Sequence, residues 1–385
     1  MIKAGIITLF HNSLNYGGIL QAFALQEMLT DNDVNVYEID YTPTTKNKSQ
    51  KTFLNMLKFK SLKQIAKKTI NYFIKKIYGC LFSKHFSELY KQRQKAFDGF
   101  KKQAFNNTIK CNQFDIEEKC SFLDVLVCGS DQIWKPTVVD DAYMLNFCMK
   151  SSKRRFSYAA SMSVDNIDDK SKIKFENWLK NLDAISVREK RAVELLQPLT
   201  NNKVHLVCDP VFLLTKKQWA AYFKKELHKK NYIFCYFLGH DIKHRKIAKK
   251  YAQKNNLDIV TFPNLVGIPD YCDSNFGTQK IYDANPIDFV QLINGAAYVL
   301  TDSFHATAFS IIMNTNFAVF ERNAIFSMNS RLISLLDNID CNNRFIKNYE
   351  DLINLENICN WDIINKQIYT ERSKGLKYIE TQMRF

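Results

Sequence analysis

The sequence predicts an α/β protein made of two Rossmann-like domains that face each other across a cleft. Apolar runs that end in polar turns and lead into helical patterns recur along the chain, as in alternating α/β folds. The length of 385 residues is enough for two domains with separate cores. The series breaks near Asp209, where Pro210 keeps a helix from starting directly. We therefore expect an N-terminal domain over residues 1–203, a C-terminal domain over 204–345 and a helical segment over 346–385.

The chain opens with a strand, a glycine-containing loop and a helix. Residues 2–10 are mostly apolar, residues 11–18 form the loop, and residues 19–29 have the apolar spacing of a helix. In α/β domains this unit opens a binding crevice at the carboxyl end of the strand. Gly17 and Gly18 would let a ligand approach the backbone, although paired glycines also simply make tight turns.

A strongly basic stretch follows over residues 46–110. It holds 17 basic residues against only Glu88 and Asp98, so it accounts for the whole net charge of +15. Its apolar residues recur at helical spacing, which predicts a basic helical insertion in the N-terminal domain. Such a surface suits anionic lipid headgroups. Nucleic acid is the competing partner, but no RNA-binding signature favours it and we expect none; a solvated helical insertion is the simpler alternative.

Two further strand ends in this half carry candidate site residues. Asp131 follows the apolar run 124–128, at the end of the strand where catalytic groups collect, although a helix cap or turn is its simpler role. Arg188 follows the apolar run that begins at residue 184. Its guanidinium suits bidentate binding of a carboxylate or phosphate, while pairing with a nearby acidic residue is the commoner fate of an arginine.

In the C-terminal half the most informative stretch is 299–312, which reads as strand, turn and helix. Ser303 is a good N-cap, so the first backbone N–H groups of the helix would be unpaired and could bind an anion. His305 would lie beside that anion, unless it is an ordinary histidine in a capping turn. Arg331 stands near the start of a later helix. With both sets of strand ends at one cleft, Arg188, His305 and Arg331 would form one anion-binding group.

Composition excludes several classes of protein. The ten cysteines include no CxxC pair, so neither a zinc cluster nor a disulfide framework is indicated and reduced thiols are the simplest interpretation. No metal-ligand spacing is visible, which predicts metal-independent activity. No run is apolar enough to span a membrane, and the N-terminus lacks a cleavage site. We expect a cytoplasmic protein that lies peripherally at the inner face of the plasma membrane if the basic stretch binds lipid.

Seven stretches follow one another in a fixed order along the chain. They are Gly5–Ala22, Cys128-Gly-Ser-Asp-Gln-Ile-Trp134, Tyr158-Ala-Ala-Ser161, Ile185-Ser-Val-Arg-Glu189, Cys208-Asp-Pro-Val211, Thr301-Asp-Ser-Phe-His305 and Asn329-Ser-Arg331. Each is weak by itself, but their shared order is specific, and they cover most of residues 1–345 apart from the basic stretch. Together they resemble the polysaccharide pyruvyl transferase family.

The resemblance implies a fold similar to the two-domain GT-B glycosyltransferases, with phosphoenolpyruvate as co-substrate and no other cofactor. The acceptor would be a hexose of a cell-envelope polysaccharide or of its lipid-linked precursor, on which a cyclic pyruvate ketal forms. The C-terminal domain would bind the donor and the N-terminal domain the acceptor. We assign the roles as follows: donor binding to Arg188, Ser303, His305 and Arg331; acid–base catalysis to His305, Asp131 and Asp209, in that order of preference; acceptor binding to Asn15, Tyr16, Gly17 and Gly18.

The chain departs from the commonest pattern of the family in one place. Many members have Arg-Leu-His where this chain has Ser303-Phe304-His305, so one donor arginine is absent and Arg331 is the candidate to replace it. The departure keeps two other functions open. One is a GT-B glycosyltransferase that uses a nucleotide sugar in the same cleft, and the other is a non-catalytic glycan-binding member of the family.

Overall fold

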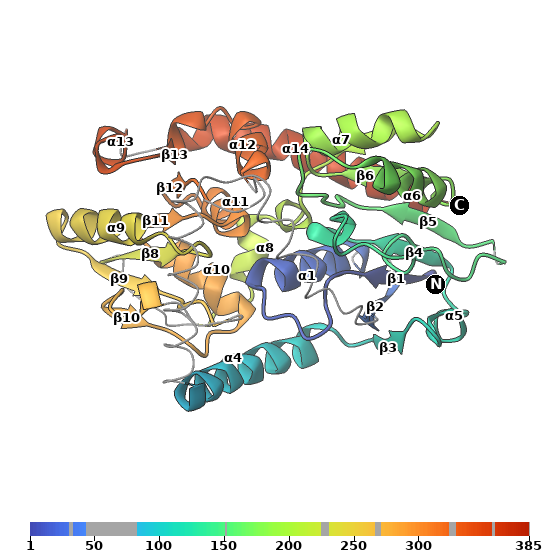
Figure 1. Ribbon diagram of the computed structural model, residues 1–385, viewed down its shortest axis with the longest axis horizontal. Helices are drawn as coiled ribbons and strands as arrows, with labels where there is room; N and C mark the ends of the chain where they lie inside the picture. The colour runs from blue at the N-terminus through green and yellow to red at the C-terminus, as the bar shows by residue number, and fades with distance from the viewer. Residues whose placement is uncertain are drawn as a thin grey trace.

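Two parallel β-sheets form the two halves of the molecule (Figure 1). The computed structural model describes residues 1–30, 34–43, 83–150, 152–224, 231–265, 271–322, 329–355 and 359–384. Within these residues every pairing between named strands is parallel, and helices cover both faces of each sheet. This confirms the predicted α/β class with two Rossmann-like domains.

The first domain has a five-stranded sheet in the order β3-β2-β1-β4-β5. Two isolated bridges extend it from β5 to a short pair, β6 and β7. The strands are β1 (Lys3–Ile7), β2 (Asn35–Thr42), β3 (Thr108–Asn112), β4 (Val125–Cys128), β5 (Arg154–Ser157), β6 (Ile185–Val187) and β7 (Val204–Leu206). Its helices are α1 (Tyr16–Thr30), α4 (Ser83–Ala104), α5 (Ile116–Lys119), α6 (Asp169–Leu179) and α7 (Lys190–Leu196).

The second domain has a six-stranded sheet in the order β10-β9-β8-β11-β12-β13. The strands are β8 (Tyr232–Tyr236), β9 (Asp258–Thr261), β10 (Gln279–Lys280), β11 (Tyr298–Thr301), β12 (Phe317–Phe320) and β13 (Phe345–Ile346). The helices after β7 are α8 (Lys216–Ala220), α9 (Ile242–Lys254), α10 (Pro286–Gly295), α11 (Phe304–Met313), α12 (Ser330–Asp337), α13 (Tyr349–Asn354) and α14 (Trp361–Met383).

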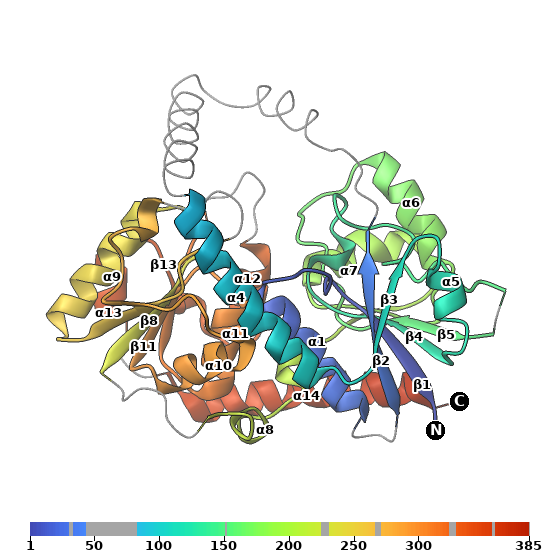
Figure 2. The same cartoon turned by 90° about the horizontal axis from the view of Figure 1, so that it is seen from below.

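The boundary between the sheets lies later than the boundary expected at 203/204. β7 pairs with β6, and the second sheet begins only at β8, so the crossover falls between Leu206 and Tyr232. α14 then returns to the first domain, as Figure 2 shows. Its residue Tyr378 packs against the core under β1 and β4 and donates a hydrogen bond to the carbonyl of Ser157 (3.1 Å). The C-terminal helix therefore packs against both domains and links them.

The helix α1 lies between the two domains and is buried on almost every side. The hydroxyl of Tyr16 donates to the carbonyl of Ala284 in the second domain (3.1 Å), and its ring stacks on Phe289 with centroids 5.1 Å apart. A helix with apolar residues all round is expected where it is covered from both sides. α1 thus places the loop that precedes it at the junction of the domains.

The stretch 46–110 is not an insertion over its whole length. Residues 44–82 lie outside the described residues, but α4 and β3 belong to the core of the molecule. Phe97 of α4 is fully buried against Tyr16. The guanidinium of Arg93 donates to three carbonyls of the second domain, those of Pro263, Ile281 and Tyr282 (2.9–3.1 Å). The amphipathic pattern of α4 therefore reflects a helix that bridges both domains. The pattern misled the prediction because burial by a neighbouring domain gives the same apolar spacing as an independent helix.

Among the helices that are described, none combines the length and the hydrophobicity needed to cross a membrane.

Candidate functional site

The predicted site residues of both domains meet in one buried cluster. Asp131, Arg188 and Asp209 lie at strand ends of the first domain, and Ser303, His305 and Arg331 belong to the second; each is less than 10% exposed. The carboxyl ends of the two sheets point to this region, which explains why residues so distant in sequence come together.

Arg188 is the centre of the cluster. Its Nη1 donates to Asp209 Oδ2, its Nη2 lies 3.4 Å from Asp131 Oδ1, and its Nε lies 3.4 Å from Glu189 Oε1. The guanidinium also covers the ring of Phe304 at 4.6 Å. Burial alone would lower the pKa of Arg188, but the three carboxylates raise it instead. The alternative given above, pairing with acidic neighbours, is therefore what the structure shows for this arginine.

Asp209 is held in its ionised form. The residue precedes Pro210 in a tight turn, where its Oδ1 accepts from the backbone N–H of Val211 (3.1 Å). Burial raises the pKa of a carboxyl, but the charge of Arg188 and the ring of His305 more than offset this and hold the pKa of Asp209 well below its usual range. A carboxylate of this kind can accept a proton or support a cation, but it has no proton to donate near neutral pH.

Asp131 has a strained backbone, with φ of 64° and ψ of −168°. That region is otherwise almost reserved for glycine, and strained residues of this kind gather at functional sites. Of the simpler alternatives given for Asp131, the helix cap does not apply, because its side chain makes no capping hydrogen bond, whereas the residue does stand in a turn before Gln132–Trp134. Its Oδ2 accepts from the amide of Asn15 (3.1 Å), and its Oδ1 lies 3.8 Å from Arg331 Nη1. Asp131 thus connects the loop before α1 to a cation of the second domain.

Gly17 and Gly18 bring the loop before α1 against the cluster. A β-carbon on Gly17 would overlap the ring of His305, and one on Gly18 would lie 3.2 Å from Asp131 Oδ2. Gly17 is therefore required by the close approach of His305, whereas a β-carbon at Gly18 would need only a small shift of the side chains of Asn15 and Asp131. The approach of a ligand to these glycines stays a prediction. Tyr16 differs from the expectation: its ring is 1% exposed and lies in the core between the domains, with its hydroxyl bonded to a backbone carbonyl.

The start of α11 presents polar atoms without hydrogen-bond partners. Ser303 caps the helix through the N–H of Ala306, although the bond is long at 3.5 Å. His305 Nε2 is buried and has no hydrogen-bond partner within the described ranges; Asp209 Oδ2 lies 3.7 Å away from it. A helix N-terminus with an unpartnered donor beside it favours an anion.

Arg331 carries the second unpartnered nitrogen at this place. Its Nε is buried and has no hydrogen-bond partner among the residues that the structure describes. Its guanidinium lies over the ring of Phe304 at 5.8 Å, on which Arg188 also rests. Burial, together with the charge of Arg188, lowers the pKa of Arg331 to about 10. The arginine is therefore charged at neutral pH but short of anionic partners.

Sequence reasoning missed two further cations. Arg322 follows β12, and its Nη2 donates to the carbonyl of Asp302 (3.0 Å). Lys135 follows the turn that contains Asp131, and burial followed by the charges of Arg331 and Arg322 lowers its pKa. Arg322 had the same signal as Arg188, a basic residue just past a strand end, and Lys135 directly follows one of the seven family-like stretches.

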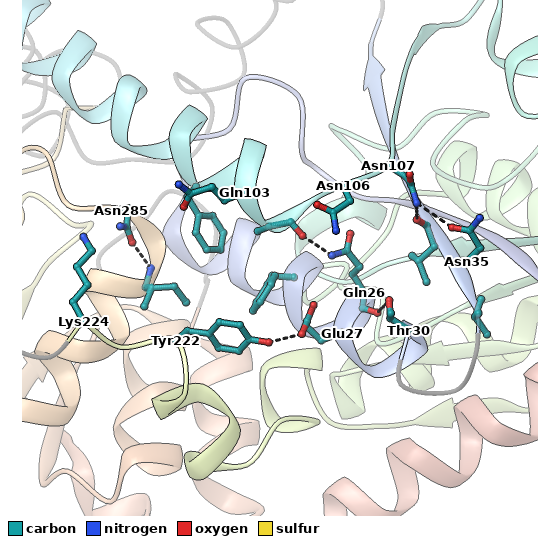
Figure 3. Close-up of a pocket in the computed structure, with 16 residues that line it drawn as sticks. Gln26, Glu27, Thr30, Asn35, Gln103, Asn106, Asn107, Tyr222, Lys224 and Asn285 are labelled. Atoms are coloured by element: carbon teal, nitrogen blue, oxygen red, sulfur yellow. Dashed lines mark hydrogen bonds between the residues drawn. The ribbon is translucent and has the colours of Figure 1, made fainter.

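A cavity of about 390 Å³ lies at the other end of α1 (Figure 3). Its lining is rich in side-chain amides, including Gln26, Asn106 and Asn107. Its two charged side chains already have partners, since Lys224 lies 3.1 Å from Asp288 and Glu27 accepts from Tyr222. This cavity thus has no buried arginine with an unpartnered nitrogen among its lining residues and is not the expected anion site.

Comparison with known proteins agrees with the resemblance in sequence and fold. The family model for polysaccharide pyruvyl transferase matches residues 15–323. A search of curated proteins gives no match.

Among solved structures, a Listeria monocytogenes protein assigned as a UDP-N-acetylglucosamine 2-epimerase is similar over 96% of this chain and 90% of its own, with 12% identity and a TM-score of 0.53. The UDP-GlcNAc 2-epimerase of Methanocaldococcus jannaschii is similar over 96% and 92%, with 12% identity and a TM-score of 0.52. At these identities the likeness concerns the fold, which is the GT-B-like arrangement of two Rossmann-like domains. The match over residues 15–323 places the chain in the polysaccharide pyruvyl transferase family.

Proposed function

We propose that this enzyme transfers pyruvate from phosphoenolpyruvate to a hexose of a cell-envelope polysaccharide or its lipid-linked precursor, forming a pyruvate ketal. Membership of the family supports the transferase activity on a glycan. The observation that carries the choice of donor is the pair of buried groups at the start of α11, Arg331 and His305, whose Nε and Nε2 atoms have no hydrogen-bond partner within the described residues. A small dianion with a carboxylate and a phosphate would satisfy both.

The donor subsite consists of Arg331, His305 and the N-terminus of α11, with Ser303 as its cap. Arg322 and Lys135 add positive charge beside Arg331, and so they replace the arginine that is absent at position 303. A phosphate at a helix N-terminus gains from backbone N–H groups and from the helix dipole together. Cations from both domains would surround it, because Lys135 belongs to the first domain and Arg322 to the second.

Arg188 has a different role from the donor contact expected for it. Since Asp209, Asp131 and Glu189 already surround its guanidinium, a donor carboxylate would have to displace one of them. We assign Arg188 to positioning: it keeps Asp209 ionised beside His305 and keeps Asp131 against Asn15. Arg331 and its neighbours bind the donor anion itself.

The reaction requires one acid and one base. His305 protonates C3 of the enol, so that C2 becomes electrophilic, and the Asp209 carboxylate 3.7 Å from Nε2 supports the protonated ring. A sugar hydroxyl adds to C2 and loses its proton, and the C2–O bond to phosphate breaks. A second hydroxyl of the same hexose then adds to C2, gives its proton to the departing phosphate and closes the ketal. Phosphate is released, and the pyruvyl carbon skeleton stays on the sugar.

Association with a membrane surface is part of the proposal. Lys84, Lys91 and Lys95 on the exposed face of α4 continue the positive charge of the sequence before it. Basic helices of this kind are attracted to anionic headgroups, and an enzyme acting on a lipid-linked glycan would work at that surface.

The direct test is release of inorganic phosphate from phosphoenolpyruvate in the presence of a panel of methyl hexosides and UDP-hexoses. A sugar product heavier by one pyruvic acid minus one water, detected by mass spectrometry, is the expected result. Transfer of a hexose from a nucleotide sugar, with no consumption of phosphoenolpyruvate, would instead assign a glycosyltransferase.

A further inference from the structure

A histidine and a carboxylate face each other at the edge of the first sheet, outside the cluster just described. His11 lies in the loop after β1, and Asp40 lies near the end of β2. Ile7 pairs with Ile39, so the chain after β1 runs directly beside Asp40. The ring atom His11 Nδ1 lies 2.8 Å from Asp40 Oδ1, and the ring is only partly buried, with 30% of the side chain exposed.

The hydrogen bonds assign the tautomer of His11. An ionised carboxylate only accepts, so Nδ1 carries the hydrogen that is directed to Asp40. On the other side of the ring, Asn12 Nδ2 lies 3.0 Å from Nε2 and is a donor, so Nε2 presents its lone pair. Thr42 Oγ1 lies farther away, 3.4 Å from Nε2 and 3.5 Å from Nδ1. An imidazole oriented by a carboxylate, whose outer nitrogen accepts only from the exposed side-chain amide of Asn12, is the arrangement of a general base once the acceptor hydroxyl takes the place of that amide.

The dyad His11–Asp40 lies on the side of the sheet that faces α1 and the second domain. In β2, residues of the same parity share a face, and Val36 packs with Leu25 of α1. Asp40 has the same parity as Val36 and therefore points to the same side. Figure 2 shows the loop after β1 running across the space between the two sheets to reach α1.

Strand spacing gives an estimate of how far the dyad lies from Asp131, which contacts Arg331 of the proposed donor subsite. The loop that carries His11 ends at Asn15, whose amide holds Asp131. β2 and β4 flank β1 on its two sides. Neighbouring strands are about 4.8 Å apart, so the ends of β2 and β4 that carry Asp40 and Asp131 are separated by roughly 10 Å. A separation of this size leaves room for one hexose, with the base on one side of it and the donor on the other.

The cluster itself contains no free base for the acceptor. Asp209 and Glu189 are committed to Arg188, Asp131 is shared between Asn15 and Arg188, and His305 is assigned as the acid. Building on the proposed function, we propose that His11, oriented by Asp40, is the general base that removes the proton from the acceptor hydroxyl. His11 Nε2 takes that proton as the hydroxyl oxygen bonds to C2 of the donor. The proton then passes to solvent through the exposed edge of the ring.

Several charged groups stand around the dyad and enter its pH dependence. Asp40 and Glu38 come from β2, and Lys101 and Asp98 come from α4; the ammonium of Lys101 interacts with all three carboxylates and donates to the carbonyl of Phe10 (3.0 Å). A base that must be unprotonated gives an activity that rises with pH, and the His11 and Asp40 variants should alter this pH profile together.

The experiment compares His11→Gln, Asp40→Asn and the control His85→Gln, in which an exposed histidine of α4 is changed. Phosphate release from phosphoenolpyruvate is measured against pH with an acceptor that the wild type uses. Both dyad variants should lose about 10²- to 10⁴-fold in kcat, keep their stabilisation by phosphoenolpyruvate, and lose the basic ionisation. Added imidazole should restore part of the activity of His11→Ala.

Three other results are decisive. If His11→Gln keeps the wild-type kcat and pH profile, His11 is not the general base, while the proposed function itself still stands. If His11→Gln also loses its stabilisation by phosphoenolpyruvate, to the same extent as its activity, the assignment is overturned as well, because the dyad would then be part of the donor subsite. Wild-type protein that releases no phosphate with any sugar of the panel overturns the proposed function, and the base assignment with it.

Discussion

His305 of the second domain packs directly against Gly17 of the first domain. A β-carbon on Gly17 would occupy the position of the imidazole ring. The proposed catalytic histidine and the loop proposed to bind the acceptor are therefore in direct contact across the domain junction, and a side chain at position 17 would prevent this contact.

We predict that Gly17→Ala lowers kcat by at least about tenfold, because the ring of His305 must leave its place. The matched control is Gly99→Ala in α4, where a β-carbon meets nothing within 4 Å and should be neutral or slightly stabilising. Activity of both variants is measured together with their thermal unfolding. Normal turnover by Gly17→Ala would show that His305 is not confined by this contact.

Arg188 and Arg331 should differ in what they contribute. Removing Arg188 leaves three buried carboxylates without their cation, so Arg188→Ala should cost about 3–5 kcal/mol of the free energy of unfolding. Arg331→Ala removes a buried charge whose Nε has no hydrogen-bond partner in the described ranges, so the cost should stay below about 2 kcal/mol while binding of phosphoenolpyruvate is lost. Urea unfolding measures the first quantity and ligand titration the second. Equal losses of stability would contradict the positioning role of Arg188.

Glu38 should make stability depend on pH. Burial raises its pKa to about 8, only partly offset by the hydroxyl of Thr8, which donates to Oε1 (2.8 Å). Since the folded state binds the proton more tightly than the unfolded chain, stability is greatest below the unfolded pKa and falls as pH rises to about 8. The loss should be on the order of 3 kcal/mol between pH 5 and 8. Glu38→Gln should flatten this dependence in urea unfolding; an identical slope in the variant would mean that other groups cause it.

Binding to anionic vesicles should depend on the exposed lysines of α4. Replacing Lys84, Lys91 and Lys95 by glutamine should weaken sedimentation with vesicles that contain phosphatidylglycerol, and added salt should weaken it further. Vesicles of neutral lipid are the control. If wild type and variant sediment equally at low salt, α4 is not part of the surface that binds the membrane.

Much of the fold and of the site could be predicted from the sequence. Parallel α/β folds bring the carboxyl ends of their strands to one edge, so Asp131, Arg188 and His305 were expected at one cleft, and they lie in one buried cluster. The pairing of Arg188 with three carboxylates could not be chosen in advance, since the sequence does not say which strand ends become neighbours. The same holds for the acidic partner of His11, which comes from another strand.

Contacts between the domains explain two features that the sequence did not predict. Tyr16 and α4 look like surface features in the sequence because nothing local covers them, yet the second domain buries Tyr16, Phe97 and Arg93.

The short strands β10 and β13 could not be predicted for another reason. Each has two residues, too few to show the alternation of apolar and polar side chains that marks a strand.

The most direct test of the account is thermal unfolding with phosphoenolpyruvate, inorganic phosphate and nucleoside diphosphates, applied to wild type, Arg331→Gln and His305→Ala. We predict that phosphoenolpyruvate raises the Tm of the wild type more than phosphate does, and that this difference disappears in both variants. Stabilisation by a nucleoside diphosphate, with no response to phosphoenolpyruvate, would contradict the account and make the chain a sugar-nucleotide enzyme.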